Sequence, residues 1–176
     1  MPFSLSPDMM RSIIMDHYAN PVHKHKPSKD GYITIHMHSD NCIDDIDVYL
    51  LIENDIVKDA CFDGVGCTIA TSSTDIMCEL LIDKTTSEAS YIIEQYNHMI
   101  HEEEFDDEVL DEAIVFVNTS KQAARIRCAT IGWRAAELLC LQKTKRVIQI
   151  TPEFIAGELI MRQSCALPKK LLQKIK

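Results

Sequence analysis

The chain has 176 residues, 46% of them hydrophobic and 26% charged, which is typical of a soluble domain large enough to fold without disulfide bonds. Eighteen basic and 27 acidic residues give a net charge of −9, so binding to nucleic acid is not expected, because nucleic-acid binders usually present a basic surface. Only five glycines occur, and they do not form the glycine-rich phosphate loops of the common nucleotide enzymes.

No apolar run approaches the roughly 18 residues of a membrane span, and the N-terminal segment lacks the basic and apolar regions of a signal peptide. We therefore expect a cytoplasmic protein with no membrane partner. In that reducing compartment the seven cysteines should remain thiols, and an odd number does not suit a closed disulfide framework. Metal binding, catalysis and core packing are the roles left for them.

The first predicted element is a helix near the N-terminus. Ser6 suits the N-cap, Pro7 suits the first helical position, and Pro21 ends the helix. Four residues at helical spacing are expected to face the core: Met10, Ile13, Ile14 and Tyr18. A short basic loop follows at residues 22–27.

Three strands are predicted next. Along residues 32–38, the apolar side chains Ile33, Ile35 and Met37 alternate with the side chains at 32, 34, 36 and 38. This period of two is typical of a half-buried strand. Residues 47–52 and 56–62 predict two more strands. The segment Glu53-Asn54-Asp55 between them suits a hairpin turn.

Helical spacing returns from Cys67 to about Leu81 and again from Ser87 to His101. Residues 102–112 then hold eight acidic and no basic residues, which we interpret as a solvated loop or helix face rather than an ion site. The longest predicted helix covers residues 120–142. Its expected buried stripe consists of Ala124, Cys128, Ile131, Ala135 and Leu138.

Residues 143–176 differ from the rest in composition. They hold eight basic and two acidic residues, a net charge of +6, which leaves −15 on residues 1–142. A Thr-Pro-Glu sequence at Thr151 suits the start of a helix that runs to about Arg162. We therefore expect a domain at 1–142 and a basic, helical C-terminal extension at 143–176. The extension is expected to dock on the acidic domain, and binding to a partner is the alternative.

Three of the seven cysteines lie where polar turns meet regular elements. Cys42 lies in a polar loop between the first two strands, Cys67 follows the segment Gly64-Val65-Gly66, and Cys128 lies in the long helix. The two glycines permit a tight turn from strand to helix. Because the helix dipole stabilises a thiolate at a helix start, we expect a lowered pKa for Cys67. The remaining cysteines are expected to serve in packing: Cys61, Cys78, Cys140 and Cys165.

The segments around these three cysteines resemble the metal-site motifs of the IscU/NifU N-terminal family of iron–sulfur cluster assembly proteins. They are Asn41-Cys42-Ile43-Asp44, Gly64-Val65-Gly66-Cys67 and Ala124-Arg125-Ile126-Arg127-Cys128-Ala129-Thr130. The segment Asp16-His17-Tyr18-Ala19-Asn20-Pro21 is similar to the end of that family's N-terminal helix. The likeness covers about residues 8–141, in the order that the family has.

Several details make the chain resemble the SufU branch of the family. The long spacing of 61 residues from Cys67 to Cys128 includes an insertion that the IscU branch lacks. Arg127 stands where the IscU branch has a histidine, and the proline-rich chaperone motif of the IscU branch is absent from this chain. Arg125 matches an arginine that SufU-like proteins place beside their metal. One departure is Ile43, which replaces the family's usual glycine and is expected to stiffen or reshape the loop that carries the first cysteine.

The resemblance implies an α+β fold in which several helices pack on a three-stranded antiparallel sheet and the metal ligands gather at one end. The implied ligands are Cys42, Asp44, Cys67 and Cys128. Three sulfurs and one oxygen suit a closed tetrahedral Zn²⁺ site, and the same residues suit the iron of a [2Fe–2S] cluster. Arg125 is expected to offset the negative charge of the site and to guide an anionic persulfide.

Two functions follow, both within iron–sulfur cluster biogenesis. In the first, the protein is a zinc-dependent sulfurtransferase whose Cys42 accepts persulfide sulfur from a pyridoxal-phosphate cysteine desulfurase of the SufS type. The insertion and the missing chaperone motif favour this function. In the second, the protein is a scaffold that assembles a labile [2Fe–2S] cluster and hands it to downstream proteins. A structural zinc module without a transfer role is a third alternative, so the sequence leaves open whether the chain is an enzyme.

Six histidines lie in or beside regular elements outside the cysteine motifs. His23, His25, His36 and His38 are candidates to substitute for a metal ligand, although their strand and loop positions explain them better. His98 and His101 lie one helical turn apart beside Glu102. We therefore expect none of the six in the cysteine site.

Overall fold

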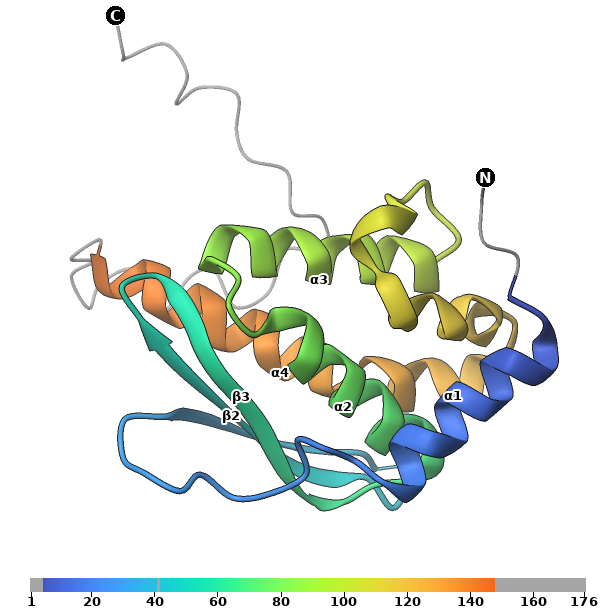
Figure 1. The fold of residues 1–176 in the computed structure, drawn as a ribbon, viewed down its shortest axis with the longest axis horizontal. Helices are drawn as coiled ribbons and strands as arrows, with labels where there is room; N and C mark the ends of the chain where they lie inside the picture. The colour runs from blue at the N-terminus through green and yellow to red at the C-terminus, as the bar shows by residue number, and fades with distance from the viewer. Residues whose placement is uncertain (1–4, 41, 148–176) are drawn as a thin grey trace, which may run out of the picture. The chain divides into compact units, whose positions relative to one another are not determined.

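A three-stranded sheet covered on one face by helices forms the fold (Figure 1). The computed structural model describes residues 5–40 and 42–147. In chain order its elements are α1 (Pro7–Ala19), β1 (Ile33–His38), β2 (Asp45–Glu53), β3 (Ile56–Val65), α2 (Thr68–Leu81), α3 (Thr86–Ile100), the 3₁₀-helices η1 (Asp107–Val109) and η2 (Asp111–Lys121), and α4 (Ala123–Val147). This is the α+β architecture that the family resemblance implied.

The chain divides into two units, residues 1–143 and residues 144–176. The predicted helix from Thr151 to Arg162, Cys165 and the docking of the basic extension all lie outside the described residues. None of the helices among residues 5–40 and 42–147 is long and apolar enough to cross a membrane.

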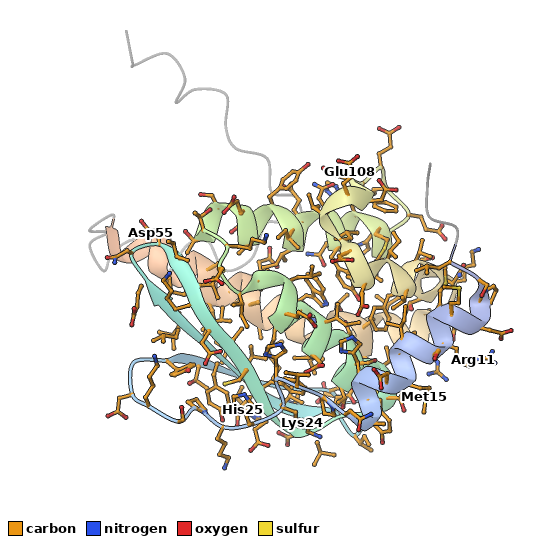
Figure 2. The ribbon with its side chains drawn as sticks, viewed as in Figure 1. Arg11, Met15, Lys24, His25, Asp55 and Glu108 are labelled. Carbon is orange, nitrogen blue, oxygen red and sulfur yellow. The ribbon has the colours of Figure 1, made fainter. Side chains whose placement is uncertain are left out.

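The strands pair antiparallel in the order β1-β2-β3. Asn54 and Asp55 form the turn between β2 and β3 with φ values of 49° and 60°, which Asn and Asp adopt more readily than most residues. Asp55 lies at the tip of this hairpin, away from Lys24 and His25 (Figure 2). One face of β2 and β3 is buried through Ile46, Val48, Leu50, Ile52, Val57, Ala60 and Phe62.

The central helix is α2, which packs against β3 and also contacts α1, α3 and η2 (Figure 1). Four consecutive hydroxyl side chains of α2 are buried: Thr71, Ser72, Ser73 and Thr74. Ser72 and Thr74 donate hydrogen bonds to carbonyl oxygens one turn earlier, each at 2.7 Å. These bonds satisfy the buried hydroxyl groups. Because serine and threonine side chains are small, neighbouring elements can pack closely against this part of α2.

Two predicted buried stripes differ from the structure. Tyr18 of α1 is 41% exposed, because this helix turns His17 rather than Tyr18 toward Asp75 of α2. Leu138 of α4 is 46% exposed, and α4 begins at Ala123 rather than at residue 120. The face of α4 that is buried carries Cys128, Ala129, Ile131, Trp133, Ala135, Ala136, Leu139 and Cys140. Apolar spacing predicted these helices correctly, but their orientation is set by the neighbours that they contact.

The acidic segment 102–112 is only partly the solvated segment that the sequence predicts. Most of its acidic side chains are exposed, but Leu110 within it is fully buried. The 3₁₀-helix η2 follows and buries Phe116. The sequence did not predict η2, because its three-residue turn does not produce the 3.6-residue spacing used to find helices.

Candidate metal centre

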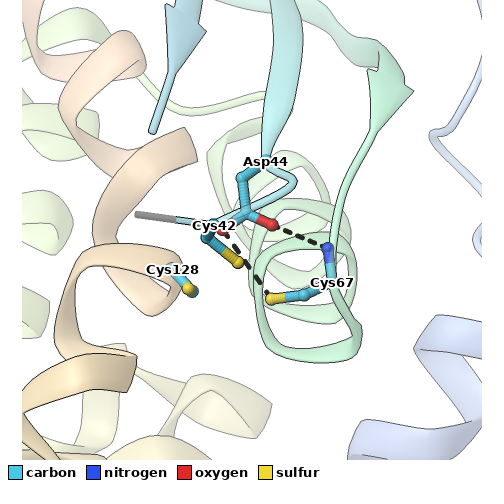
Figure 3. Close-up of side chains that lie close together, drawn as sticks. All are labelled: Cys42, Asp44, Cys67 and Cys128. Carbon is cyan, nitrogen blue, oxygen red and sulfur yellow. Dashed lines mark hydrogen bonds between the residues drawn. The ribbon is translucent and has the colours of Figure 1, made fainter. Parts of the chain in front are cut away.

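Four side chains from three separate parts of the chain converge at one end of the sheet. Cys42 and Asp44 lie in the loop between β1 and β2, Cys67 is the N-cap of α2, and Cys128 lies in the second turn of α4. One sulfur or oxygen atom of each lies within 4.8 Å of the corresponding atoms of the other three (Figure 3). The structure thus brings together the four residues that the family resemblance implied as ligands.

Asp44 is the most deeply buried of the four, with an exposure of 1%. Its carboxylate accepts a hydrogen bond from the backbone N–H of Cys67 at 2.7 Å and a weaker one from the Cys67 thiol at 3.7 Å (Figure 3). Burial alone would raise the pKa of Asp44, but hydrogen bonds from the cysteine thiols and from the Cys67 N–H lower it on balance. Asp44 is therefore a carboxylate at neutral pH, held in place by the cysteines around it.

Two glycines permit the close approaches that bring the site together. Gly64 has a φ of +119°, and a Cβ there would lie 2.3 Å from the carbonyl oxygen of Asp45, so only glycine fits where β3 passes the start of β2. A Cβ on Gly132 of α4 would lie 2.5 Å from the hydroxyl of Thr74 in α2. These contacts set how closely the elements that carry the four side chains can pack.

The thiols of Cys67 and Cys128 hold their protons more strongly than ordinary cysteines. The N–H of Ala70 at the start of α2 donates to the sulfur of Cys67 and lowers its pKa, which is the predicted helix-start effect. Burial raises the pKa of Cys67 by more than this hydrogen bond lowers it, and the Asp44 carboxylate raises it further. The pKa of Cys67 is therefore raised, and the predicted lowering was wrong. Burial and hydrogen bonding to Asp44 also raise the pKa of Cys128 far above its usual value. A bound cation has to displace these protons.

A buried hydrogen-bond network around the residue that follows Cys128 joins α2, α3 and α4. Ser73 accepts a bond from the indole N–H of Trp133 at 2.9 Å and donates to the carbonyl oxygen of Ala129 at 2.6 Å. Tyr96 donates to the same carbonyl at 3.1 Å, and its ring stacks on Trp133 with centroids 3.9 Å apart. Because Ala129 follows Cys128 directly, this network fixes the helix turn that carries the thiol. Sequence reasoning missed it, and the single tryptophan of the chain was the only available signal.

The other candidate residues lie outside the four-residue cluster. Arg125 is exposed in the first turn of α4, three residues before Cys128. Among the described residues no hydrogen bond or ion pair holds its side chain. Three further cysteines are buried as expected for packing: Cys61, Cys78 and Cys140. No histidine belongs to the cluster: His17, His23, His25, His36, His38, His98 and His101 all lie elsewhere in the described part of the chain.

The donor set fits a metal ion of the zinc or iron class. Three sulfurs and one oxygen are enough to close a tetrahedral Zn²⁺ site, and thiolates also hold the irons of [2Fe–2S] clusters. The single oxygen is a harder ligand than the sulfurs, so the set is less suited to permanent structural binding than four cysteines.

The sequence profile of the NifU-like N terminal domain matches residues 9–137, which is most of the chain. The chain belongs to this family. Its membership confirms the resemblance on which the fold was predicted, and the arrangement of sheet and helices agrees with it.

Individual relatives of this NifU-like chain include both branches of the family. It is 34% identical to the zinc-dependent sulfurtransferase SufU of Bacillus subtilis (strain 168), over 78% of this chain and 93% of that protein. It is 33% identical to the iron–sulfur cluster assembly scaffold protein IscU of Thermotoga maritima, over 53% of this chain and 66% of that protein. The crystal structure of a putative iron–sulfur cluster assembly scaffold protein for the SUF system from Fervidobacterium islandicum AW-1 superposes with a TM-score of 0.69 at 28% identity, covering 73% of this chain and 93% of that one.

Proposed function

We propose that the chain accepts and carries persulfide sulfur for iron–sulfur cluster assembly, with zinc held by Cys42, Asp44, Cys67 and Cys128. The observation that carries the proposal is the convergence of three thiols and one carboxylate within 4.8 Å. The likeness to a protein named zinc-dependent sulfurtransferase, across 93% of that protein's length, supports it.

The four side chains have distinct tasks in this proposal. When bound, zinc supplies positive charge that keeps the thiols deprotonated near neutral pH. Asp44 contributes the one oxygen: the N–H of Cys67 binds Oδ1 and so holds the carboxylate with Oδ2 toward the Cys67 sulfur. Cys128 is 6% exposed on a helix that the Ser73 network fixes, so it remains in place as a ligand.

Cys42 is the proposed sulfur acceptor. It lies half-buried in a loop, next to Ile43, which is 65% exposed, so a donor can approach it from solution. The Cys42 thiolate attacks the outer sulfur of a donor persulfide. The S–S bond of the donor breaks, the donor leaves as a thiolate, and a new S–S bond leaves Cys42 as a persulfide. One sulfur atom moves between two thiols, so no other oxidant or reductant is consumed.

Arg125 is proposed to guide the incoming persulfide. Its guanidinium is exposed three residues before Cys128, on the helix that borders the site. The persulfide is anionic, and a guanidinium can hold an anion through charge-assisted hydrogen bonds. Arg125 therefore acts on the approach of the donor rather than as a ligand.

The proposed donor is a pyridoxal-phosphate cysteine desulfurase of the SufS type, and the receivers are downstream iron–sulfur assembly or acceptor proteins. Such a donor generates a persulfide on its own cysteine, which is the substrate that the step at Cys42 requires. The setting for this exchange is the cytoplasm, where thiols remain reduced. Nucleic acid and membranes have no part in the proposal.

A second candidate function is a scaffold for a labile [2Fe–2S] cluster held by the same four residues. The likeness to a protein named an IscU scaffold protein favours it. Metal analysis of protein purified without oxygen separates the two. Colourless protein with one zinc supports sulfur transfer, whereas brown protein that holds iron and sulfide supports the scaffold.

The decisive test is sulfur transfer to Cys42 itself. We expect that incubation with a cognate desulfurase and cysteine adds about 32 Da, one sulfur atom, to the peptide that contains Cys42. Cys42→Ser should abolish activation of the desulfurase, while Cys78→Ala, which removes a buried thiol outside the site, should retain it. Sulfur on Cys67 or Cys128 alone, or full activation by Cys42→Ser, would overturn the assignment. No exchangeable sulfur on any of them would leave a structural zinc module.

A further inference from the structure

A groove in the helical part of the domain lies outside the cysteine site. Its larger part is a hollow of about 510 Å³ where the end of α2, the start of α3 and η1 meet. A smaller hollow of about 120 Å³ adjoins it, and Leu80 and Asp111 line both. None of the lining residues is a candidate metal ligand. We call the two hollows together the α2–α3 groove.

Apolar side chains from three elements line the larger hollow: Leu80 of α2, Ile92 of α3 and Val109 of η1. Ile92 is 5% exposed, and the other two are half-buried. Tyr91 beside them is 44% exposed, although its hydroxyl donates a hydrogen bond to Asp106 at 3.3 Å. An aromatic ring that lies in water next to apolar side chains is stabilised when a bound segment covers it. The α2–α3 groove therefore offers an apolar surface for docking.

Carboxylates surround these apolar side chains. The residues that line the two hollows include one base, Lys84, and five acids: Glu79, Glu88, Glu108, Asp111 and Glu112. Lys84 is close enough to Glu88 to offset its charge, and His17 contacts Glu112 at 2.8 Å. The other three acids are exposed and form no ion pair within residues 5–40 and 42–147. The rim thus carries negative charge that favours a basic segment.

The last ten residues of the chain have the complementary composition. Residues 167–176 hold four lysines and no acidic residue. Apolar side chains recur among the lysines at intervals of three and four residues: Leu167, Leu171, Leu172 and Ile175. Such spacing is typical of a segment with one apolar and one charged side. Amphipathic segments of this kind bind by laying the apolar side into a groove, which leaves their charges at its rim.

The connection between the domain and this segment is long enough to reach the groove. The 19 residues from 148 to 166 span up to roughly 60 Å when extended. A globular domain of 143 residues has a radius of gyration of only about 15 Å. A segment joined to its own docking site is also present there at an effective concentration of order 1 mM, so that weak binding is enough. These two facts favour a segment of the same chain over a separate partner.

We propose that the α2–α3 groove is the docking site for residues 167–176 of the same chain. The apolar side of the segment covers Leu80, Tyr91 and Val109, and its lysines lie opposite the acids of the rim. Composition alone predicts only that a basic extension is attracted to an acidic domain, whereas the groove supplies a defined apolar surface inside an acidic rim. This docking is independent of the function proposed for the cysteines.

The test uses the full chain and follows trypsin cleavage after the lysines of residues 167–176 by mass spectrometry. Docking protects these lysines. In Glu79→Lys/Glu108→Lys the rim repels them, so the initial cleavage rate should rise by a factor of about five or more. The matched control is Glu104→Lys/Glu137→Lys. It changes the net charge equally at two exposed acids that do not line the groove, and should leave the rate unchanged.

A second measurement observes the groove itself. In the full chain, Leu171→Ser/Ile175→Ser removes two apolar side chains of the segment and alters no residue of the domain. We expect the NMR methyl signals of Leu80 and Val109 to shift, while that of Val57, buried against the sheet, stays in place. All variants should keep the circular dichroism spectrum of the unchanged chain.

Five results would overturn the proposal. Three are an unchanged cleavage rate in Glu79→Lys/Glu108→Lys, an equal rise in the control, and methyl signals of Leu80 and Val109 that do not shift. The fourth is protection from trypsin that increases with protein concentration alongside a dimer in light scattering, which would assign the segment to a second copy. The fifth is binding to vesicles of phosphatidylserine and phosphatidylcholine that Leu171→Ser/Ile175→Ser abolishes without the methyl shift, which would assign it to a lipid surface.

Discussion

Two aspartates are buried at α2, Asp75 within the helix and Asp44 against its N-cap, and they differ in what surrounds them. Asp44 is 1% exposed and Asp75 is 0% exposed, and each accepts a backbone N–H at 2.7 Å, from Cys67 and from His23 respectively. Asp75 also binds Nδ1 of His17 at 2.7 Å, and Nε2 of that ring binds Glu112 of η2 at 2.8 Å. Among the described residues, the side chains in contact with Asp44 are thiols, and none is basic.

The comparison shows how one helix contacts both a structural site and a candidate metal site. A carboxylate bonded to a histidine and an N–H is satisfied within the protein, so Asp75 fastens α1 and the following loop to α2. The thiols around Asp44 are weak hydrogen-bond donors, and they can give up their protons when a metal binds. Asp44 is therefore suited to a ligand that is bound and released, and Asp75 to a permanent structural contact.

The largest expected effect is the loss of stability on removal of Asp75. In Asp75→Ala, the N–H of His23 and the ring of His17 lose their buried partner, which should lower the free energy of unfolding by about 3 kcal/mol. Urea unfolding followed by circular dichroism measures this. Zinc affinity of the variant, measured under conditions where it is folded, should stay close to that of the unchanged chain. An unchanged unfolding free energy would show that Asp75 does not fasten α1.

Asp44→Ala should show the opposite behaviour. We expect the domain to remain folded while the zinc affinity falls by a factor of about 10 to 100, because one of four donors is lost. Competition with a chromogenic chelator measures the affinity. If the variant is loaded with a cluster, release should become slower, since oxygen ligation makes a cluster more labile. Unaltered zinc affinity would remove Asp44 from the ligand set.

The contact of His17 predicts a dependence of stability on pH. Burial would lower the pKa of His17, but hydrogen bonds and charge interactions with Asp75 and Glu112 raise it above 6.5 on balance. A raised pKa means that the folded state binds the proton more tightly. This stabilisation is complete below pH 6.5 and is lost as the pH rises through the higher value of the folded state.

The difference in urea midpoint between the unchanged chain and His17→Gln isolates this contribution. We expect the difference to be largest near pH 6 and to shrink as the pH rises toward 8. A difference that is the same at every pH would mean that the contact does not depend on the charge of His17. The cysteine site should be insensitive to this substitution.

The smallest effect is expected from removal of residues 148–176. The four candidate ligands and Asp75 lie before this segment, so zinc affinity should be unchanged within error, although stability can fall. Comparison of the truncated and full-length chains by chelator competition tests this. Loss of zinc on truncation would mean that the extension contributes to the site.

Local patterns predicted most of the elements because each depends on neighbouring residues. The hairpin at Asn54 and Asp55 follows from residues that tolerate positive φ, and the start of α1 follows from Ser6 and Pro7. Burial was predicted less well. Tyr18 and Leu138 have the spacing of core residues and yet are exposed, because the face that a helix buries depends on which neighbour it meets.

The candidate site shows the same division. The sequence by itself determined the family, the four candidate ligands and the glycine turn before Cys67, because each motif and each turn depends on residues that are close together in the chain. Only the tertiary structure decided that burial raises the pKa of Cys67 against the helix-start effect, that Ser73, Tyr96 and Trp133 hold the turn after Cys128, and that His36 and His38 meet two aspartates. Desolvation, packing and cross-strand register arise between residues far apart in the chain, so no local pattern contains them.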